Sequence, residues 1–257
     1  MTFHPQGNSR EQILLIGSWG AGKSYAWLST AKRIPEAHFY ILDTTFDAER
    51  MVEGESLTNV TITHVDEWDE WIEASEKYRT IATRDDWLVV DLVSDLWGAA
   101  QRAYSDKAFG KPIDDWFLSA KAEADAKDTN VGGIIAGSHG ENWGMINKMY
   151  QRAIMSILRF PGHILAVAPA EQVSEPNQQG KGGDSIELRN LFNRFKLKPS
   201  GQKNLAFQFH TILLMREKSK DNWIMDTVRD RNRERLTNTT VTDFSLNYLM
   251  KVAGWRP

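Results

Sequence analysis

An α/β fold with a mostly parallel central sheet flanked by helices is predicted by three observations. Apolar runs of strand length alternate along the chain with segments whose apolar residues have helical spacing. The first of these runs leads through a glycine-rich loop into a helix. Hydrophobic residues make up 41% of the chain, which is enough for a sizeable core. Alternation of this kind favours parallel strands joined by crossover helices.

The predicted elements follow one another in a regular order. Strands are expected at residues 12–16, 38–43, 60–65, 87–91 and 163–168. Helices are expected at residues 23–33, 66–78 and 143–160. Two more strands, at residues 206–215 and 223–228, are expected to form a C-terminal strand pair. The chain as a whole, residues 1–257, is predicted to be a single domain.

Two segments interrupt this pattern. Residues 105–142 combine a stretch rich in Ala, Lys, Asp and Glu with a glycine-rich run, and they are expected to form an insertion or flexible excursion. Residues 172–204 are polar, rich in Gly and Gln, and contain a cluster of basic residues. We expect this second segment to be a mobile basic loop.

Charge and composition exclude several classes of protein. The 31 Lys and Arg residues nearly balance 34 Asp and Glu residues, so the protein as a whole has no positive electrostatic field that would attract DNA. Any DNA site must therefore be a local basic patch. The absence of cysteine excludes a disulfide scaffold, a Cys-ligated zinc site and thiol catalysis. The first ten residues lack the apolar core of a signal peptide, and no apolar stretch approaches the roughly 20 residues of a membrane span. A soluble, intracellular protein without membrane contact is therefore expected.

The segment from Gly17 to Ser24, GSWGAGKS, matches the phosphate-binding P-loop pattern G-x-x-x-x-G-K-[ST]. Its glycines let backbone N–H groups turn toward phosphate oxygens, and the helix that follows directs its positive end at the anion. The residues expected to bind nucleotide are Gly17, Ser18, Trp19, Gly20, Ala21, Gly22, Lys23, Ser24 and Tyr25. The alternative is a strand–turn–helix corner that binds nothing.

Two of these positions have specific chemical roles in a P-loop. Lys23 can reach the β- and γ-phosphates of ATP, and the Ser24 hydroxyl can coordinate Mg²⁺. A second Mg²⁺ ligand is expected at the end of a neighbouring strand, and Asp91 ends the strand predicted at residues 87–91. The alternative role for Asp91 is to cap the following helix.

Hydrolysis also needs a group that orients the attacking water. Asp43, Asp47 and Glu49 lie at or just after the end of the second strand, and Glu171 follows the fifth strand. Each is a candidate for orienting water or sensing the γ-phosphate, and each can equally be a solvated or capping acid. Trp19, inside the loop, can stack on a base or a neighbouring subunit, or simply pack.

The chain resembles the phage-encoded RecA-like P-loop ATPases, including phage proteins implicated in single-strand annealing. The resemblance covers most of the chain and is carried by a few segments, of which only the P-loop is highly specific. These are the P-loop at residues 17–24, the strand ending at Asp91, residues 142–147 leading through a helix to residues 163–171, and residues 201–210 followed by residues 228–231.

This resemblance implies a RecA-like fold and an ATPase that uses ATP and Mg²⁺. It implies coupling of hydrolysis to single-stranded DNA binding in phage-type recombination or annealing, in the host cytoplasm. It also implies a homo-oligomer, a ring or filament whose active site is shared between subunits. A single-stranded-DNA-binding protein is a further partner of such a system.

The sequence departs from the family at two places. Thr44 and Thr45 follow Asp43, where RecA-like proteins usually carry a glutamate, so the acid that positions the water is not identified. The K-x-R position of the family is occupied by Arg229 and Arg231. The resemblance implies that one or both reach the γ-phosphate bound by an adjacent subunit, whereas the alternative is a solvated basic turn.

In the family, the flexible segment after the fifth strand borders the DNA channel. The matching residues here supply cations for phosphates, and two phenylalanines, Phe192 and Phe195, are available to stack on bases. The predicted DNA contacts are Lys181, Arg189, Arg194, Lys196 and Lys198. A solvated loop without a ligand is the alternative.

Three other functions remain open from the sequence. One is another nucleic-acid motor, such as a packaging ATPase or helicase. A second is a small-molecule kinase with residues 105–142 as its lid, although that segment lacks the arginine that usually grips a transferring phosphate. A third is a nucleotide-gated binding protein with little turnover.

Overall fold

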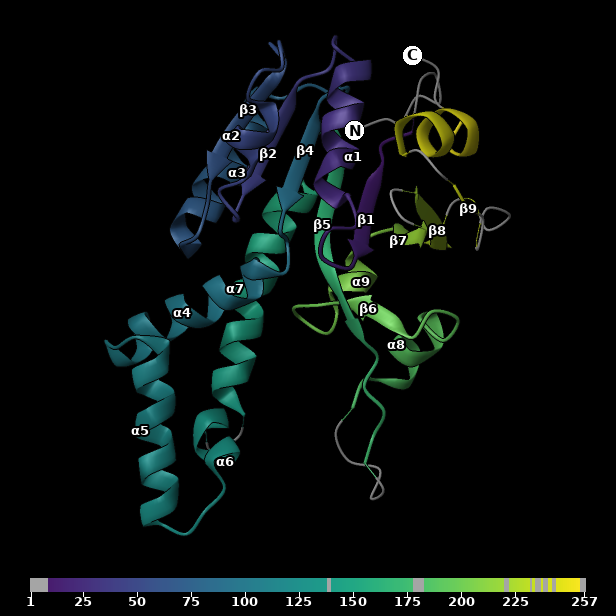
Figure 1. The fold of residues 1–257 in the computed structure, drawn as a ribbon. Helices are drawn as coiled ribbons and strands as arrows, with labels where there is room; N and C mark the ends of the chain where they lie inside the picture. Colours follow the sequence, from purple (N-terminus) through teal and green to yellow (C-terminus); the bar gives the residue numbers. More distant parts are fainter. Residues whose placement is uncertain are drawn as a thin grey trace.

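The computed structural model describes residues 9–137, 140–177, 183–219 and 222–231, together with residues 233, 237, 240–241 and 244–254. Its centre is a sheet in the order β3-β2-β4-β5-β1-β7-β8-β9 (Figure 1). The first six strands in this order are parallel. They are β3 (Val60–His64), β2 (Phe39–Asp43), β4 (Trp87–Asp91), β5 (His163–Gln172), β1 (Gln12–Gly17) and β7 (Thr211–Ser219).

The remaining strands are antiparallel to their neighbours. β8 (Asn222–Asp230) pairs with β7, and β9 (Thr240–Val241) pairs with β8. The short β6 (Leu197–Pro199) pairs with the end of β5, outside the main order. The predicted α/β architecture, with a mostly parallel sheet, flanking helices and a C-terminal strand pair, is confirmed.

Alternate residues of each central strand point to opposite faces of the sheet, and both faces are covered. Leu14, Leu42 and Val90 pack against α3 (Trp68–Ile81), α4 (Asp95–Phe109) and α7 (Glu141–Leu158). Residues one position away, such as Leu15 and Ile41, pack against α1 (Lys23–Arg33), α2 (Ala48–Val52) and the π-helical η2 (Phe244–Val252). Burial on both faces explains why these strands are continuous apolar runs rather than alternating ones.

Two predicted strand boundaries are corrected by the structure. β5 extends to Gln172 rather than ending at residue 168, because β6 supplies hydrogen-bonding partners for its last residues. The strand predicted at residues 206–215 begins only at Thr211, and the residues before it form the short helix α9 (Leu205–Gln208). Arg229 holds this helix by donating hydrogen bonds to the carbonyls of Ala206 and Phe209, each at 2.6 Å.

Most of the described residues between 105 and 142 are helical, rather than a flexible excursion. α4 continues to Phe109 and is followed by α5 (Ile113–Ala126) and α6 (Val131–Ala136), which extend away from the sheet as an arm (Figure 1). An aromatic cluster holds the base of this arm: the rings of Phe109 and Trp116 stack with centroids 4.9 Å apart. The first part of the glycine-rich run forms α6, which the Asn130 side chain caps by accepting from the backbone N–H of Gly132 at 2.7 Å.

The described part of residues 172–204 contains α8 (Ile186–Leu191) and β6. Within the part of the chain that the structure describes, no helix is long and apolar enough to cross a membrane.

Two adjacent residues of α7 are expected to differ in how much their side chains contribute to stability. Ile154 is fully buried against the sheet, whereas Met155 is 39% exposed. Ile154→Ala is expected to lower the free energy of unfolding by about 2–5 kcal/mol, because it leaves a cavity in a packed layer. Met155→Ala, as the control, should change it by less than about 1 kcal/mol. Urea denaturation of both variants measures the difference, and equal losses would contradict this placement of α7.

Candidate functional site

The P-loop lies at the carboxyl end of β1, in the middle of the sheet between β5 and β7. Gly17 ends the strand in close contact with β7: a Cβ atom there would lie 2.6 Å from the carbonyl oxygen of Met215. Gly22 precedes the first residue of α1 with a φ of 79°, in the left-handed region that side chains other than glycine rarely adopt. The loop between them therefore depends on glycine at both positions.

Lys23 is the first residue of α1, and its side chain folds back over the loop. Its Nζ donates to the carbonyl oxygen of Ser18 at 2.8 Å and lies 5.7 Å from the centre of the Trp19 ring. Burial lowers the pKa of Lys23, and the nearby charge of Asp91 opposes that shift. The ammonium group is thus partly desolvated and held at the loop, where a phosphate would be its strongest partner.

Asp91 ends β4, which is separated from β1 by β5. Asp91 pairs with Val167 of β5, and Gly17 pairs with Pro169 of the same strand. The ends of β4 and β1 are therefore only two residues apart along β5. The Asp91 side chain is buried, and its Oδ1 makes no hydrogen bond of standard geometry among the described residues. Such a carboxylate oxygen is costly to bury unless a ligand completes it.

The electrostatic surroundings of Asp91 agree with this interpretation. Burial raises the pKa of Asp91 above its usual range, and the charge of Asp43 adds to this shift. Hydrogen bonding to Ser24, the charge of Lys23 and hydrogen bonding to the Trp27 side chain oppose it. Ser24 and Asp91 are thus in contact at the position where a P-loop holds Mg²⁺. The orphaned oxygen and the adjacent hydroxyl fit such an ion.

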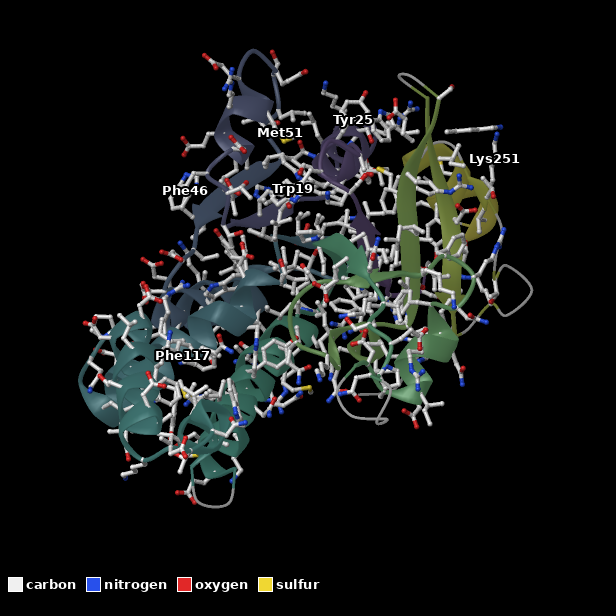
Figure 2. All side chains as sticks on the ribbon, turned by 60° about the horizontal axis from the view of Figure 1, so that its bottom comes forward. Trp19, Tyr25, Phe46, Met51, Phe117 and Lys251 are labelled. Carbon is white, nitrogen blue, oxygen red and sulfur yellow. The ribbon has the colours of Figure 1, made fainter. Side chains whose placement is uncertain are left out.

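A cleft of about 580 Å³ brings these groups together. Its lining includes the P-loop residues Trp19, Gly20, Gly22, Lys23, Ser24 and Tyr25, with Asp43 and Asp91 from the neighbouring strands. Trp19 and Tyr25 are 75% and 61% exposed, and Figure 2 shows both at the same end of the molecule as Met51. The cleft therefore has a polar floor and an apolar, aromatic rim.

Sequence reasoning did not identify the cleft wall formed by Arg50 and Met51. Both belong to α2, which follows β2 and carries no recognisable motif. The available signal was only their position, a few residues after a strand that ends at the P-loop edge. Ligands of parallel α/β sheets bind at that edge, so the loop after β2 was a reasonable place to look.

Among the expected catalytic acids, Asp43 has hydrogen-bond partners within its own loop. Its Oδ1 accepts from the backbone N–H and the hydroxyl of Thr45, at 3.0 and 2.9 Å, and its Oδ2 accepts from the N–H of Ala48 at 3.0 Å. These bonds shape the loop that leads into α2. Asp47 lines the cleft and is exposed, whereas Glu49 lies 3.1 Å from Nε2 of His64.

Glu171 lies within β5 and does not line the cleft. Its carboxylate forms an ion pair with Lys198, and the same lysine lies 3.4 Å from Oδ1 of Asp184. Lys198 is therefore buried between two acids, and it acts as a tie between β6, β5 and the loop after β5. A lysine held in this way does not present its charge to a DNA phosphate in the described structure.

The other predicted DNA contacts are placed differently. Arg189 pairs with Glu175 at 2.7 Å, whereas Arg194 and Lys196 are exposed. Lys181 lies outside the described residues. Phe192 is fully buried in the core and Phe195 packs against it, so the expectation that Phe192 stacks on bases is wrong.

Arg229 and Arg231 lie at the opposite edge of the sheet from the P-loop. β8 runs antiparallel to β7, so Asp230 pairs with Thr211 while the P-loop is level with Met215. Arg231 donates to the carbonyl of Phe207 at 2.9 Å, beside the bonds that Arg229 makes to the same segment. In one chain these arginines stabilise α9; a role at a neighbouring subunit's nucleotide stays a prediction.

Among the described residues no group of three His, Asp or Glu side chains is arranged to hold a metal ion. That finding does not bear on a P-loop, where Mg²⁺ takes few protein ligands and completes its shell with phosphate oxygens and water.

Two neighbouring buried aspartates should respond oppositely to neutralisation. When folding raises the pKa of a carboxyl group, ionisation of that group lowers the free energy of unfolding. The loss develops as pH rises from the unfolded pKa, about 4, through the folded pKa. Asp91→Asn is therefore expected to be more stable than the wild type at pH 7, with the gain disappearing toward pH 4. Asp43→Asn should instead lose about 1–3 kcal/mol at pH 7, because its oxygens accept from three donors.

Thermal and urea unfolding between pH 4 and pH 8 tests both variants. Destabilisation of Asp91→Asn at pH 7 would contradict an unsatisfied carboxylate at this position.

Comparison with known proteins leaves the site to be interpreted from its own geometry. No protein-family model matches the chain, and no curated protein matches it significantly.

Proposed function

We propose that this protein is a P-loop ATPase that binds ATP with Mg²⁺ and hydrolyses it. The observation that carries the proposal is the convergence of Lys23, Ser24 and the orphaned carboxylate oxygen of Asp91 in one cleft. The P-loop amides and Lys23 would bind the β- and γ-phosphates, while Ser24 and Asp91 would hold Mg²⁺. Bound Mg²⁺ would neutralise charge on the phosphate oxygens.

The RecA-like assignment is part of this proposal. It is supported by the order of elements: the P-loop strand and the strand ending in Asp91 flank β5, and an antiparallel strand pair closes the sheet beyond β7. Substrate binding at the carboxyl edge of a parallel sheet is the general arrangement of such folds.

The kinase alternative receives little support from the arm formed by α5 and α6. The hollow in this arm, about 810 Å³, is lined by residues between Phe109 and Asn142. None of these residues lines the P-loop cleft. A lid for phosphate transfer would have to close over that cleft.

Coupling to single-stranded DNA is the second part of the proposal. Arg194 and Lys196 are exposed cations beside β6, with the Arg194 guanidinium 4.8 Å from the centre of the Phe195 ring. The Lys196 amine donates to Oδ1 of Asn193 at 2.7 Å, a bond that a phosphate oxygen would replace. β6 pairs directly with the end of β5, next to the P-loop strand.

Lys23→Ala is expected to reduce ATP turnover by at least about 10²–10³-fold, because a positioned charge on the transferring phosphate is lost. The control is Lys32→Ala on the same helix, where the lysine pairs with Glu55 at 2.5 Å. Phosphate release at saturating Mg²⁺-ATP, calorimetric binding of ATP and thermal unfolding measure turnover, affinity and folding separately. A folded Lys23→Ala protein with unchanged turnover would remove the P-loop from the reaction.

Replacing Arg194 and Lys196 together with serine should weaken binding to single-stranded DNA. Each lost phosphate contact is expected to lower the slope of log affinity against log salt by about 0.7. Fluorescence anisotropy with a labelled oligonucleotide at several salt concentrations measures both quantities, with ATPase rates recorded with and without DNA.

The control for this experiment is Lys77→Ser/Arg79→Ser on α3, which lies far from β6 in Figure 1. Equal affinity and slope in both double variants would show that residues 194–196 do not contact DNA. Absence of DNA binding by the wild type would reject the coupling itself.

A further inference from the structure

A second hollow adjoins the P-loop cleft at the same edge of the sheet. It measures about 540 Å³ and shares Trp19, Thr45 and Leu92 with the cleft. The ends of β2 and β4, the first turn of α4 and the turn after β6 enclose it. Its other lining residues include Thr44, Ser94, Asp95, Arg102, Pro169 and Gly201. Solvent in this hollow is therefore adjacent to the phosphate loop.

Asp95 is an exposed carboxylate in this hollow, and its orientation is fixed by two hydroxyl groups. Thr44 Oγ1 donates to its Oδ2 at 2.7 Å, and Ser94 Oγ donates to its Oδ1 at 3.1 Å. A carboxylate oxygen can accept more than one hydrogen bond, so both oxygens keep acceptor capacity for water.

Thr44 is itself held by backbone groups next to Asp91. Its hydroxyl oxygen accepts from the N–H of Leu92 at 2.9 Å, and its own N–H donates to the carbonyl of Asp91 at 2.8 Å. The N–H of Leu92 occupies an acceptor site of the Thr44 hydroxyl, so the hydroxyl proton is directed toward an oxygen acceptor. Oδ2 of Asp95, at 2.7 Å, is nearer to the hydroxyl than the carbonyl oxygen of Asp91, at 3.3 Å. Thr44 therefore holds the Asp95 carboxylate in a fixed position relative to the end of β4, where Asp91 lies.

Asp66, the other carboxylate that lines this hollow, pairs with Arg102 at 2.6 Å. The acids expected from the sequence are engaged elsewhere or face another part of the cleft. Asp43 accepts from three donors in its own loop, and Glu171 pairs with Lys198. Glu49 contacts His64. Asp47 lies on the α2 side of the cleft and does not line the second hollow.

We propose that Asp95, positioned by Thr44, is the carboxylate that orients and deprotonates the water attacking the γ-phosphate; this inference rests on the proposed ATPase function. The water oxygen forms a bond to the γ-phosphorus, and the bond from that phosphorus to the β,γ-bridging oxygen breaks with its electrons leaving on ADP. The water proton passes to the Asp95 carboxylate and from there to solvent. Thr44 acts as a positioning residue.

The test compares Asp95→Asn, Thr44→Val and Thr44→Ser with the wild type. Asp95→Asn is expected to lower kcat by about 10²-fold or more while the Kd for Mg²⁺-ATP stays within about threefold. Thr44→Val should lower kcat about tenfold, and Thr44→Ser, which keeps the hydroxyl, should restore most of it.

Asp106→Asn is the matched control, because Asp106 is an exposed acid three turns further along α4 and should leave kcat unchanged. Thermal unfolding confirms that each variant is folded. Wild-type turnover in Asp95→Asn would overturn this inference alone, and failure of Thr44→Ser to restore turnover would overturn the role of Thr44. A wild type that releases no phosphate from bound ATP would overturn the proposed hydrolysis, and this inference with it.

Discussion

The site depends on the parallel register of four strands, β2, β4, β5 and β1. Asp43 pairs with Asp91, Asp91 pairs with Val167, and Gly17 pairs with Pro169. Parallel pairing places all four carboxyl ends at one edge, so segments separated by tens of residues meet there. A slip of one residue in any of these pairs would turn the strand's buried residues to the other face, which makes the register strongly specified.

That edge contains two buried aspartates with different roles. Asp43 is satisfied by hydrogen-bond donors of its own loop and is best understood as part of the fold. Asp91 keeps a buried carboxylate oxygen that makes no hydrogen bond of standard geometry among the described residues. Buried polar atoms are usually paired, and an ion or water is one explanation for an unpaired one. The opposite pKa shifts of Asp91 and Lys23 have the same cause, since burial disfavours both charges.

Several of the described basic residues outside the P-loop have structural partners. Lys198 ties β6 to β5 through Glu171 and Asp184, and Arg229 and Arg231 hold the segment around α9. Arg233 similarly bonds Glu11 at 2.6 Å, joining the C-terminal part of the chain to the start of β1. Removing Lys198 or Arg233 would leave buried carboxylates without their partner, so these two residues are poor choices for testing DNA contacts.

Features that depend on neighbouring residues could be predicted from the amino-acid pattern. The P-loop is a strand, a glycine loop and a helix within some twenty residues, so a local pattern is enough to predict it. The central strands were predictable because burial on both faces requires continuous apolar runs, and Asp91 was predictable as the polar residue that ends one of them. The helices of the arm were missed because their alanine- and lysine-rich composition and glycines gave no clear apolar face, whereas an aromatic cluster at Trp116 stabilises them.

Which charged side chains are available at the site depends on contacts between distant segments of the folded chain. Thr44 and Asp95 are hydrogen-bonded although 51 residues separate them in the chain. The burial of Lys198 likewise depends on Asp184 and Glu171, which three different segments bring together. A carboxylate or an ammonium group has the same chemistry at every position in a sequence. Its role depends on its partners and its burial. Both are set by strand register and by contacts between residues far apart in the chain, which a local sequence pattern does not reveal.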